Sequence, residues 1–423
     1  MTKRTSLSIA ALLGATASFG LVSSAMAGSF ERNRNISVSE RPKPEYQTNG
    51  IDLGGFILRP ELATGLKYND NIFALRTNTV DDVIFKFNPS AVIQSKWSVH
   101  SLAFHASVDH NEYLDLSSES YTDLTFGSDA RLDAGQGLTF GFGGQYQALN
   151  EPRTSSSSPI NTTKPIEYDL VSFYANASRE VNRIRVSASV GLRDYDYKDG
   201  TLIGGGVVDQ DDRDRAVVDL SGRAEYAVSP DTSVFVEVGY NDRYYDLQPP
   251  ATPLNRDSDG YQVLVGANFD LSNLVRGEVA IGYLDQRFED PTLSGVSGFA
   301  IRANVDWFVT PLTTVGIGGN RSVEDSGIAG SSGYLSSSAY FKVDHELLRN
   351  LILSGELTYG YDDYEGVDRQ DERVGGTISS TILLKRGLGL SLFYTYANQT
   401  SGGINSGTNY NSSQIGFNLK FQR

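Results

Sequence analysis

The sequence predicts an all-β protein: a transmembrane antiparallel up-and-down β-barrel of about 18 strands, with short periplasmic turns and long extracellular loops. From Phe56 to the end of the chain, segments with an apolar residue at every second position recur. A period of two indicates strands with one apolar face. Between these segments, short turns alternate with long polar loops, and that asymmetry is typical of outer-membrane barrels.

The first 27 residues are predicted to be a signal peptide. Lys3 and Arg4 form its basic start, and a run of small and apolar residues spans positions 6–22. Ala25 and Ala27 form a small-x-small cleavage site, so we expect the mature chain to begin near residue 28. An uncleaved membrane anchor is the alternative, but the apolar run is short for a membrane-spanning helix.

Residues 28–55 are predicted to be an extended periplasmic tail, and residues 56–423 to be the barrel. The tail is polar, and Pro42 and Pro44 disfavour both helix and sheet. Beyond the signal, no stretch approaches the roughly 20 apolar residues of a membrane helix. A transmembrane strand needs only about 9–11 residues with alternate residues apolar, so a membrane barrel remains compatible with this pattern.

Composition excludes several classes of protein. The chain has no Cys, which excludes a disulfide scaffold, a Cys-based metal centre and a thiol nucleophile. It has only four His, so we predict no metal site and no cofactor. After removal of the signal, 34 basic residues face 51 acidic ones, a formal charge of -17, which argues against nucleic-acid binding. The mature chain also lacks Met, which suits an oxidising compartment.

The strand count follows from the alternating segments. Every second residue over 234–241 is Val or Tyr, and similar alternation recurs over 275–285 and 388–396. The first strand is expected near residues 56–69 and the last near 409–421. An even count places both ends of the barrel on the short-turn side, which agrees with a periplasmic tail.

The connections fall into two classes. Short turns are expected at residues 133–137, 229–232, 309–312 and 385–387. Long polar loops are expected at residues 151–165, 198–212, 247–259 and 364–371.

Aromatic residues near the strand ends predict two girdles at the membrane surfaces. Tyr followed by Asp or Asn recurs where strands enter the long loops, and two Trp residues lie beside short turns. Ordinary β-propensity of Tyr is the alternative explanation. The predicted girdle residues are Tyr68, Tyr195, Tyr240, Tyr283, Tyr361, Tyr394, Trp97 and Trp307.

The polar faces of the strands are predicted to line an aqueous lumen. Because Arg and Lys are about as numerous there as Asp and Glu, they either create a transverse field or simply pair across strands. The acidic excess lies in the expected outer loops, which either bind divalent cations or are merely solvated. The predicted lumen residues are Arg183, Arg185, Arg193, Arg215, Asp219, Arg223, Glu225, Glu237, Arg276, Glu278, Arg302, Asp306, Lys342 and Glu356.

Two other folds are alternatives to the barrel. A soluble sandwich would also show polar faces to solvent, but it does not explain the signal, the even count and the turn asymmetry together. A β-propeller matches the spacing of Tyr195, Tyr240 and Tyr283. Its blades, however, have both sheet faces buried, whereas these strands carry charges on one face.

Nothing in the sequence predicts an enzyme. His100, His105 and His110 are spaced by five, so they alternate faces on a strand and only His105 points inward. His345 lies near a short turn, and no Gly-x-Ser-x-Gly or Gly-rich phosphate loop is present.

The N-terminal block resembles a known family. It reads Arg41-Pro42-Lys43-Pro44-Glu45-Tyr46, then Gly50-Ile51, Gly55-Phe56-Ile57-Leu58 with Pro60, and Tyr68-Asn69-Asp70-Asn71-Ile72-Phe73. These residues resemble the putative β-barrel porin 2 family of Gram-negative bacteria, and the strand pattern extends the similarity over most of the mature chain. The last strand, residues 415–421, resembles the signal read by the outer-membrane insertion machinery, although Gln422 and Arg423 displace the usual terminal aromatic.

The resemblance implies a pore in the outer membrane, and many family members are encoded beside exopolysaccharide genes. Our leading hypothesis is a channel for hydrophilic solutes or for a secreted exopolysaccharide. The expected partners are outer-membrane lipid, lipopolysaccharide, the insertion machinery and polysaccharide export proteins. A non-conducting adhesion or structural barrel is the runner-up, and an outer-membrane enzyme is the third alternative.

Overall fold

The computed structural model describes residues 36–159, 161–247, 254–272 and 274–423. The predicted cleavage residues Ala25 and Ala27 lie outside the described residues. Helix is confined here to two short 3-10 turns, η1 (Ser117–Glu119) and η2 (Asp211–Arg213). Within the described ranges, no helix is long and apolar enough to cross a membrane.

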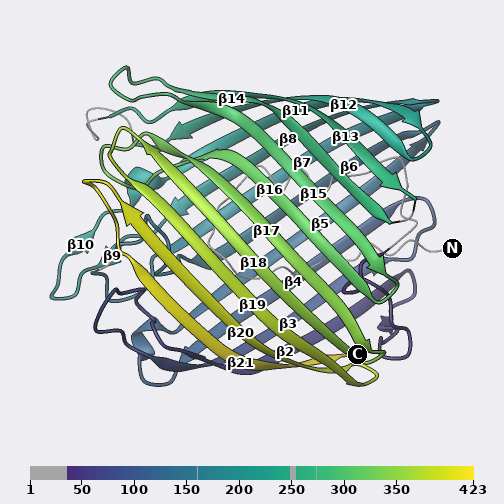
Figure 1. Cartoon of the computed structure of the whole chain (residues 1–423), viewed down its shortest axis with the longest axis horizontal. Coiled ribbons are helices and arrows are strands. Elements are labelled where there is room, and N and C mark those ends of the chain that lie inside the picture. Colours follow the sequence, from purple (N-terminus) through teal and green to yellow (C-terminus); the bar gives the residue numbers. More distant parts are fainter. Residues whose placement is uncertain (1–35, 160, 248–253, 273) are drawn as a thin grey trace.

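Eighteen antiparallel strands of the described chain form one closed barrel (Figure 1). Each strand pairs with the next along the chain, and the last pairs with the first, which removes the open edges of the sheet. The predicted fold and strand number are therefore confirmed.

The bounds of the first and last barrel strands agree closely with the ranges expected from the sequence. The first barrel strand, β2, has the predicted range, and the last, β21, is displaced by one residue. The strands are β2 (Phe56–Asn69), β3 (Asp82–Ser95), β4 (Ser101–Tyr113), β5 (Tyr121–Gly135), β6 (Leu138–Asn150), β7 (Glu167–Val181), β8 (Ile184–Tyr197), β11 (Arg215–Ser229), β12 (Thr232–Tyr245), β13 (Ser258–Leu271), β14 (Val275–Phe288), β15 (Val296–Thr310), β16 (Thr313–Glu324), β17 (Gly333–Leu348), β18 (Leu351–Glu365), β19 (Gln370–Lys385), β20 (Leu388–Gly402) and β21 (Tyr410–Gln422).

Three further strands are short. β1 (Ile51–Asp52) pairs with the start of β2. β9 (Gly200–Thr201) and β10 (Val207–Val208) pair with each other in the loop between β8 and β11. This loop lies at the long-loop end of the barrel, whereas β2 begins and β21 ends at the short-turn end.

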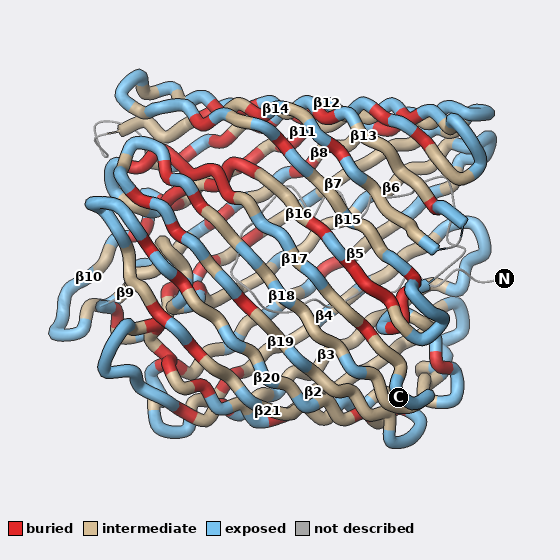
Figure 2. Tube along the Cα trace, viewed as in Figure 1, coloured by how far each residue is buried: buried red, intermediate tan, exposed pale blue. Residues whose placement is uncertain are grey.

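Alternation along the strands separates two faces of the wall. On β14, Val279, Ile281 and Tyr283 are exposed outward, while Ala280 and Leu284 are buried. A closed sheet places the opposite set of side chains inside the barrel. Figure 2 shows exposed and more buried residues interspersed along the strands.

The hairpin between β16 and β17 separates from β15 towards its tip, while β17 stays paired with β18 up to Gly333 and Glu365. Pairing of β15 with β16 stops at Arg302 and Asn320, although β15 begins at Val296. Pairing of β16 with β17 continues to Glu324 and Tyr334. We call residues 321–336 the inner hairpin, because its tip packs against the inside of the wall; most of its residues are buried (Figure 2).

The N-terminal tail braces the short-turn end of the barrel. Its described part is not extended as predicted, because residues 37–47 form two tight turns in which Ser37 O accepts from Arg41 N and Lys43 O accepts from Gln47 N. We call residues 37–48 the strap. Arg41 donates to Pro311 O at 2.7 Å, and Lys43 donates to Arg349 O at 2.9 Å.

The strap continues to a third turn. Gly387 N donates to Tyr46 O at 2.8 Å, and Arg386 donates to Gln47 O at 2.8 Å. The Arg-Pro-Lys-Pro-Glu-Tyr segment therefore joins three successive short turns, which explains why polar residues and prolines serve there.

Candidate functional site

The inner wall is the candidate site, and it holds nearly all the predicted lumen residues. All but Arg183 lie on strands, at positions that alternate with the outward apolar residues. Arg183 is exposed in the turn between β7 and β8, so its predicted place on the wall is wrong. The reason is that β7 ends at Val181 and the tight turn interrupts the alternation before β8 begins.

Four of these residues meet in a central charge cluster: Arg223, Glu237, Glu278 and Arg302. Arg302 holds both carboxylate oxygens of Glu237, at 2.9 and 2.7 Å, and its Nε lies 3.2 Å from Glu278. Arg223 Nη2 lies 2.9 Å from Glu278 and its Nη1 lies 3.5 Å from Glu237. Each Arg thus contacts both Glu residues, and the lining charges pair across strands.

The floor of the cluster is apolar and close-packed. Between Glu237 on β12 and Glu278 on β14, the inward positions of β13 include Leu264 and Gly266. A Cβ on Gly266 would lie 2.4 Å from the Phe235 ring, so only glycine fits there. The Arg223 guanidinium lies 3.5 Å from the centre of the Phe235 ring, which adds a cation–π contact.

The other predicted residues form smaller groups along the wall. Glu225 accepts a hydrogen bond from Ser233, and Glu356 lies opposite Lys342 in the register of β17 and β18. Ion pairs join Arg185 to Glu180 at 2.6 Å, Arg193 to Asp219 at 2.7 Å, Arg276 to Asp306 at 2.7 Å and Lys342 to Asp344 at 3.2 Å.

An apolar patch inside the barrel was not predicted. Val323 and Leu335 of the inner hairpin pack against buried inward residues of β12 to β15. The sequence does contain an indication of this patch, since the inward positions of four successive strands include apolar residues. The wall side of the patch consists of Phe235, Leu264, Ala280, Leu284, Val296 and Ala300.

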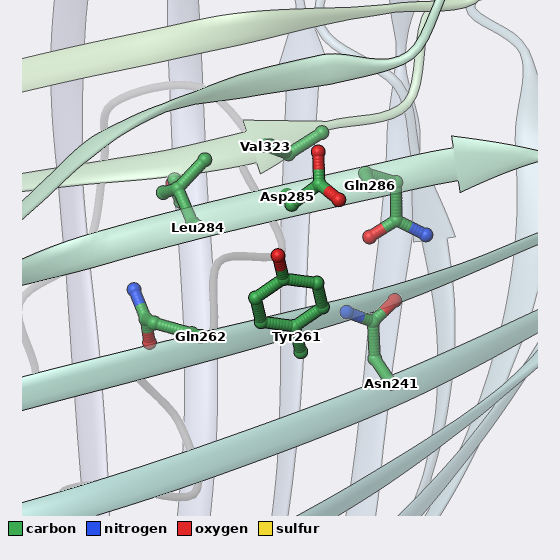
Figure 3. Close-up of a pocket in the computed structure, with 8 residues that line it drawn as sticks. Asn241, Tyr261, Gln262, Leu284, Asp285, Gln286 and Val323 are labelled. Carbon is green, nitrogen blue, oxygen red and sulfur yellow. The ribbon is translucent and has the colours of Figure 1, made fainter.

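A small recess marks where the inner hairpin meets the wall (Figure 3). Ser322 and Val323 come from β16, and β12, β13 and β14 supply the remaining lining. Asn241, Gln262 and Gln286 bring amide groups to this border between polar and apolar surfaces.

Beyond this recess, arginines hold the tip of the inner hairpin. Asp325 Oδ2 lies 2.9 Å from Arg215 Nε, and Asp325 Oδ1 accepts from Arg243. Arg243 also donates to Val323 O at 3.1 Å, and Arg256 donates to Ser326 O. We call Arg215, Arg243 and Arg256 the arginine clamp.

The neighbouring arginines, more than burial, determine the pKa of the Asp325 carboxyl group in the clamp. Burial acts to raise the pKa of Asp325, but Arg243 and Arg215 outweigh it and hold this pKa well below its usual range. Two tyrosines support the clamp. Arg215 lies 4.4 Å from the centre of the Tyr195 ring, and Arg256 lies 4.9 Å from that of Tyr245.

Tyr195 does not lie in the predicted girdle, so this part of the prediction is wrong. It is buried inside the barrel, because it follows Arg193 by two residues and shares its inward face. The remaining girdle residues stay a prediction: Tyr68, Tyr240, Tyr283, Tyr361 and Tyr394 lie on the outer face, Trp97 lies in the turn before β4, and Trp307 lies on the outer face near a short turn.

The four histidines do not gather in one place. His105 points inward, 3.5 Å from Asp129, whereas His110 points outward, 3.2 Å from Glu112. His100 accepts from Asp133 N in a turn region, and His345 contacts Thr313 at 2.9 Å.

Three exposed carboxylates, those of Asp199, Asp209 and Asp211, lie within 4.8 Å of one another in the loop after β8. Two of them already accept backbone N–H groups, from Gln210 and from Asp211. Such acidic groups are common in solvated loops, so we assign no ion to them.

The chain is similar to known proteins at the level of a family and of solved structures. A family model described as putative beta-barrel porin 2 matches residues 43–423. No curated protein matches the chain. Among solved structures, it is similar to OpdL of Pseudomonas aeruginosa, at 12% identity and a TM-score of 0.46 over 88% of this chain and 99% of that one. It is also similar to OccAB4 of Acinetobacter baumannii, at 12% identity and a TM-score of 0.46 over 90% and 100% of the two chains.

Proposed function

The chain belongs to the putative beta-barrel porin 2 family, and from this premise we propose that it is a non-enzymatic outer-membrane channel. Hydrophilic solutes, or a secreted exopolysaccharide strand, cross through its charged interior. The short turns face the periplasm in this proposal, and the long loops face the outside. Outer-membrane lipid, lipopolysaccharide, the barrel insertion machinery and polysaccharide export proteins are the proposed partners.

One observation carries the proposal: a closed barrel of 18 strands whose inner wall is charged and whose outer wall is apolar. Barrels of about 16–18 strands enclose an aqueous channel rather than a core of side chains. Exposed apolar side chains on the outer face, such as Ile281 and Phe299, are stable where lipid covers them.

The inner charges are proposed to set the preference for ions. Fixed charges in a narrow aqueous passage are poorly screened, so they bias which ions enter. The residues proposed to act in this way are Arg185, Arg223, Glu237, Arg276, Glu278 and Arg302.

Conductance across planar bilayers tests the channel. Purified, folded protein is expected to give discrete current steps, and protein that folds but gives no current contradicts an open channel. Heat-modifiable gel migration provides the control for folding, because an intact barrel and an unfolded chain migrate differently.

A non-conducting structural or adhesion barrel is the second candidate, and contacts among the loops at the long-loop end favour it. Arg153 pairs with Glu119 of the neighbouring loop at 2.7 Å, and Arg213 pairs with Glu151 at 2.7 Å. Gly327 of the inner hairpin donates to Ser157 at 3.1 Å. If these contacts close the barrel permanently, the folded protein binds cells or surface polymers without conducting.

A further inference from the structure

The arginine clamp is occupied by the protein's own inner hairpin, whose tip crosses the interior to reach it. Asp325 lies 110 residues from Arg215 and 82 residues from Arg243 in sequence. The central charge cluster, in contrast, pairs residues of the wall with one another. The partner of the clamp therefore belongs to a segment far from it in the sequence, at the tip between β16 and β17.

Every group that residues 323–326 offer to the arginine clamp is a hydrogen-bond acceptor. Arg215 and Arg243 share the Asp325 carboxylate, Arg243 also binds Val323 O, and Arg256 binds Ser326 O. A carboxylate flanked by neutral oxygens presents the same chemistry as a hydroxy acid or an acidic sugar.

The clamp is held in place by groups outside the inner hairpin. Arg215 donates to Arg213 O at 2.8 Å and lies on Tyr195. Arg243 Nε donates to Asn241 at 3.2 Å, and Arg256 lies on Tyr245. Displacement of the tip that carries Asp325 would leave three positioned guanidinium groups facing the interior.

The tip of the inner hairpin, residues 325–332, belongs to no strand. β16 leaves β15 at Asn320, whereas β17 stays paired with β18 up to Gly333 and Glu365, so displacement of Asp325 requires movement of this tip and not of the whole hairpin. The apolar contacts of Val323 and Leu335, together with the clamp, hold the tip.

We propose that the arginine clamp is a binding site for a carboxylate-bearing hydrophilic solute, and that Asp325 is a tethered competitor which the solute displaces. The proposal rests on the proposed channel for the arrival of the solute. It adds the class of solute and the residues that select it, since paired guanidinium groups bind carboxylates with two hydrogen bonds each.

The test compares D-galacturonate with neutral D-galactose, which lacks the carboxylate. Calorimetry on detergent-folded protein measures binding, and planar bilayers measure block of the current. Asp325→Ala removes the competitor, so galacturonate is expected to bind at least about fivefold more tightly than to the unchanged protein, because the competent state becomes more populated. Galactose is expected to bind neither form.

Controls separate the clamp from general charge effects. Asp363→Asn, on the outer face, is expected to leave galacturonate affinity unchanged. Arg243→Gln added to Asp325→Ala is expected to abolish the gain, whereas Arg287→Gln, an outward arginine, is expected to preserve it. Heat-modifiable migration confirms that each variant is folded, and Asp325→Asn replaces Asp325→Ala if the latter does not fold.

Equal affinity before and after removal of Asp325, or equal binding of galactose, overturns the clamp proposal. Calorimetry does not require conduction, so the two proposals fail separately. Tightened binding without any current refutes the open channel and supports the clamp, whereas current without tightened binding refutes the clamp alone.

Discussion

Arg223 on β11 and Glu278 on β14 form a 2.9 Å ion pair, although two strands separate them. Neighbouring strands lie about 4.8 Å apart, so these backbones are roughly 14 Å apart along a flat sheet. Inward curvature of the wall and two long side chains close that distance. Because Arg302 and Glu237 complete the same contacts, these four charges form one connected cluster.

Reversal of both arginines in this cluster is expected to change ion preference. Arg223→Glu together with Arg302→Glu leaves Glu237 and Glu278 without their cationic partners. The interior then favours cations, by on the order of threefold or more in permeability ratio. Reversal potentials in a salt gradient measure this change. Arg287→Glu on the outer face is the control, and an unchanged potential in the double variant would falsify the lumen assignment.

Gly316 and Gly318, on one face of β16, are expected to differ in how well they tolerate replacement by alanine. A Cβ on Gly318 would lie 2.2 Å from the Tyr340 ring, whereas a Cβ on Gly316 meets nothing closer than 3.6 Å. Gly318→Ala pushes Tyr340 away from Asn304, to which it donates at 2.9 Å. The expected loss is about 1–3 kcal/mol of unfolding free energy, from overpacking.

Urea unfolding in detergent measures the loss at Gly318. Gly316→Ala is the matched control and is expected to unfold near the midpoint of the unchanged protein. Equal midpoints for the two variants would show that Tyr340 relaxes without cost.

Lys43 is expected to matter more to stability than its neighbour Glu45. Lys43 is buried, and it contacts Arg349 O at 2.9 Å and Glu346 at 3.1 Å. Lys43→Met removes both contacts and leaves Glu346 with the longer, 3.9 Å contact to Arg41, at a cost of about 1–3 kcal/mol. Glu45 pairs with Arg349 in full solvent, so Glu45→Gln is expected to change nothing measurable. Thermal unfolding of both variants tests the strap, which is refuted as a brace if Lys43→Met leaves the midpoint in place.

The loop after β8 is expected to loosen as pH rises. Burial and nearby carboxylates, chiefly Asp196, raise the pKa of Asp214 from 3.8 to about 6, despite the hydrogen bond from Tyr197 N. The folded loop therefore binds this proton more tightly than the unfolded loop. Its stability is greatest below 3.8 and falls as pH rises from 3.8 to about 6.

Hydrogen exchange of residues 198–214, corrected for the intrinsic rate, measures this loosening. Faster exchange is expected at pH 7.5 than at pH 4.5, and Asp214→Asn is expected to flatten the difference because the amide does not titrate. A pH dependence that survives in Asp214→Asn assigns the effect to another carboxyl group.

Local alternation predicted the barrel wall well. The range of β2 and the inward faces of β11, β12 and β14 follow from a period of two, which is a property of each strand alone. The same rule explains the error at Tyr195. Residues two apart in a strand share a face, so Tyr195 points inward with Arg193. Arg183 failed for the opposite reason, because the rule stops at a turn.

The sequence by itself thus determined the strands, their number and the two faces of the wall, since these depend on residues near one another in the chain. Only the tertiary structure decided which charges meet and where the chain leaves the wall. Asp325 reaches Arg215 across 110 residues because Val323 and Leu335 find an apolar patch inside the barrel. Such contacts depend on curvature and on distant segments, which no local period encodes.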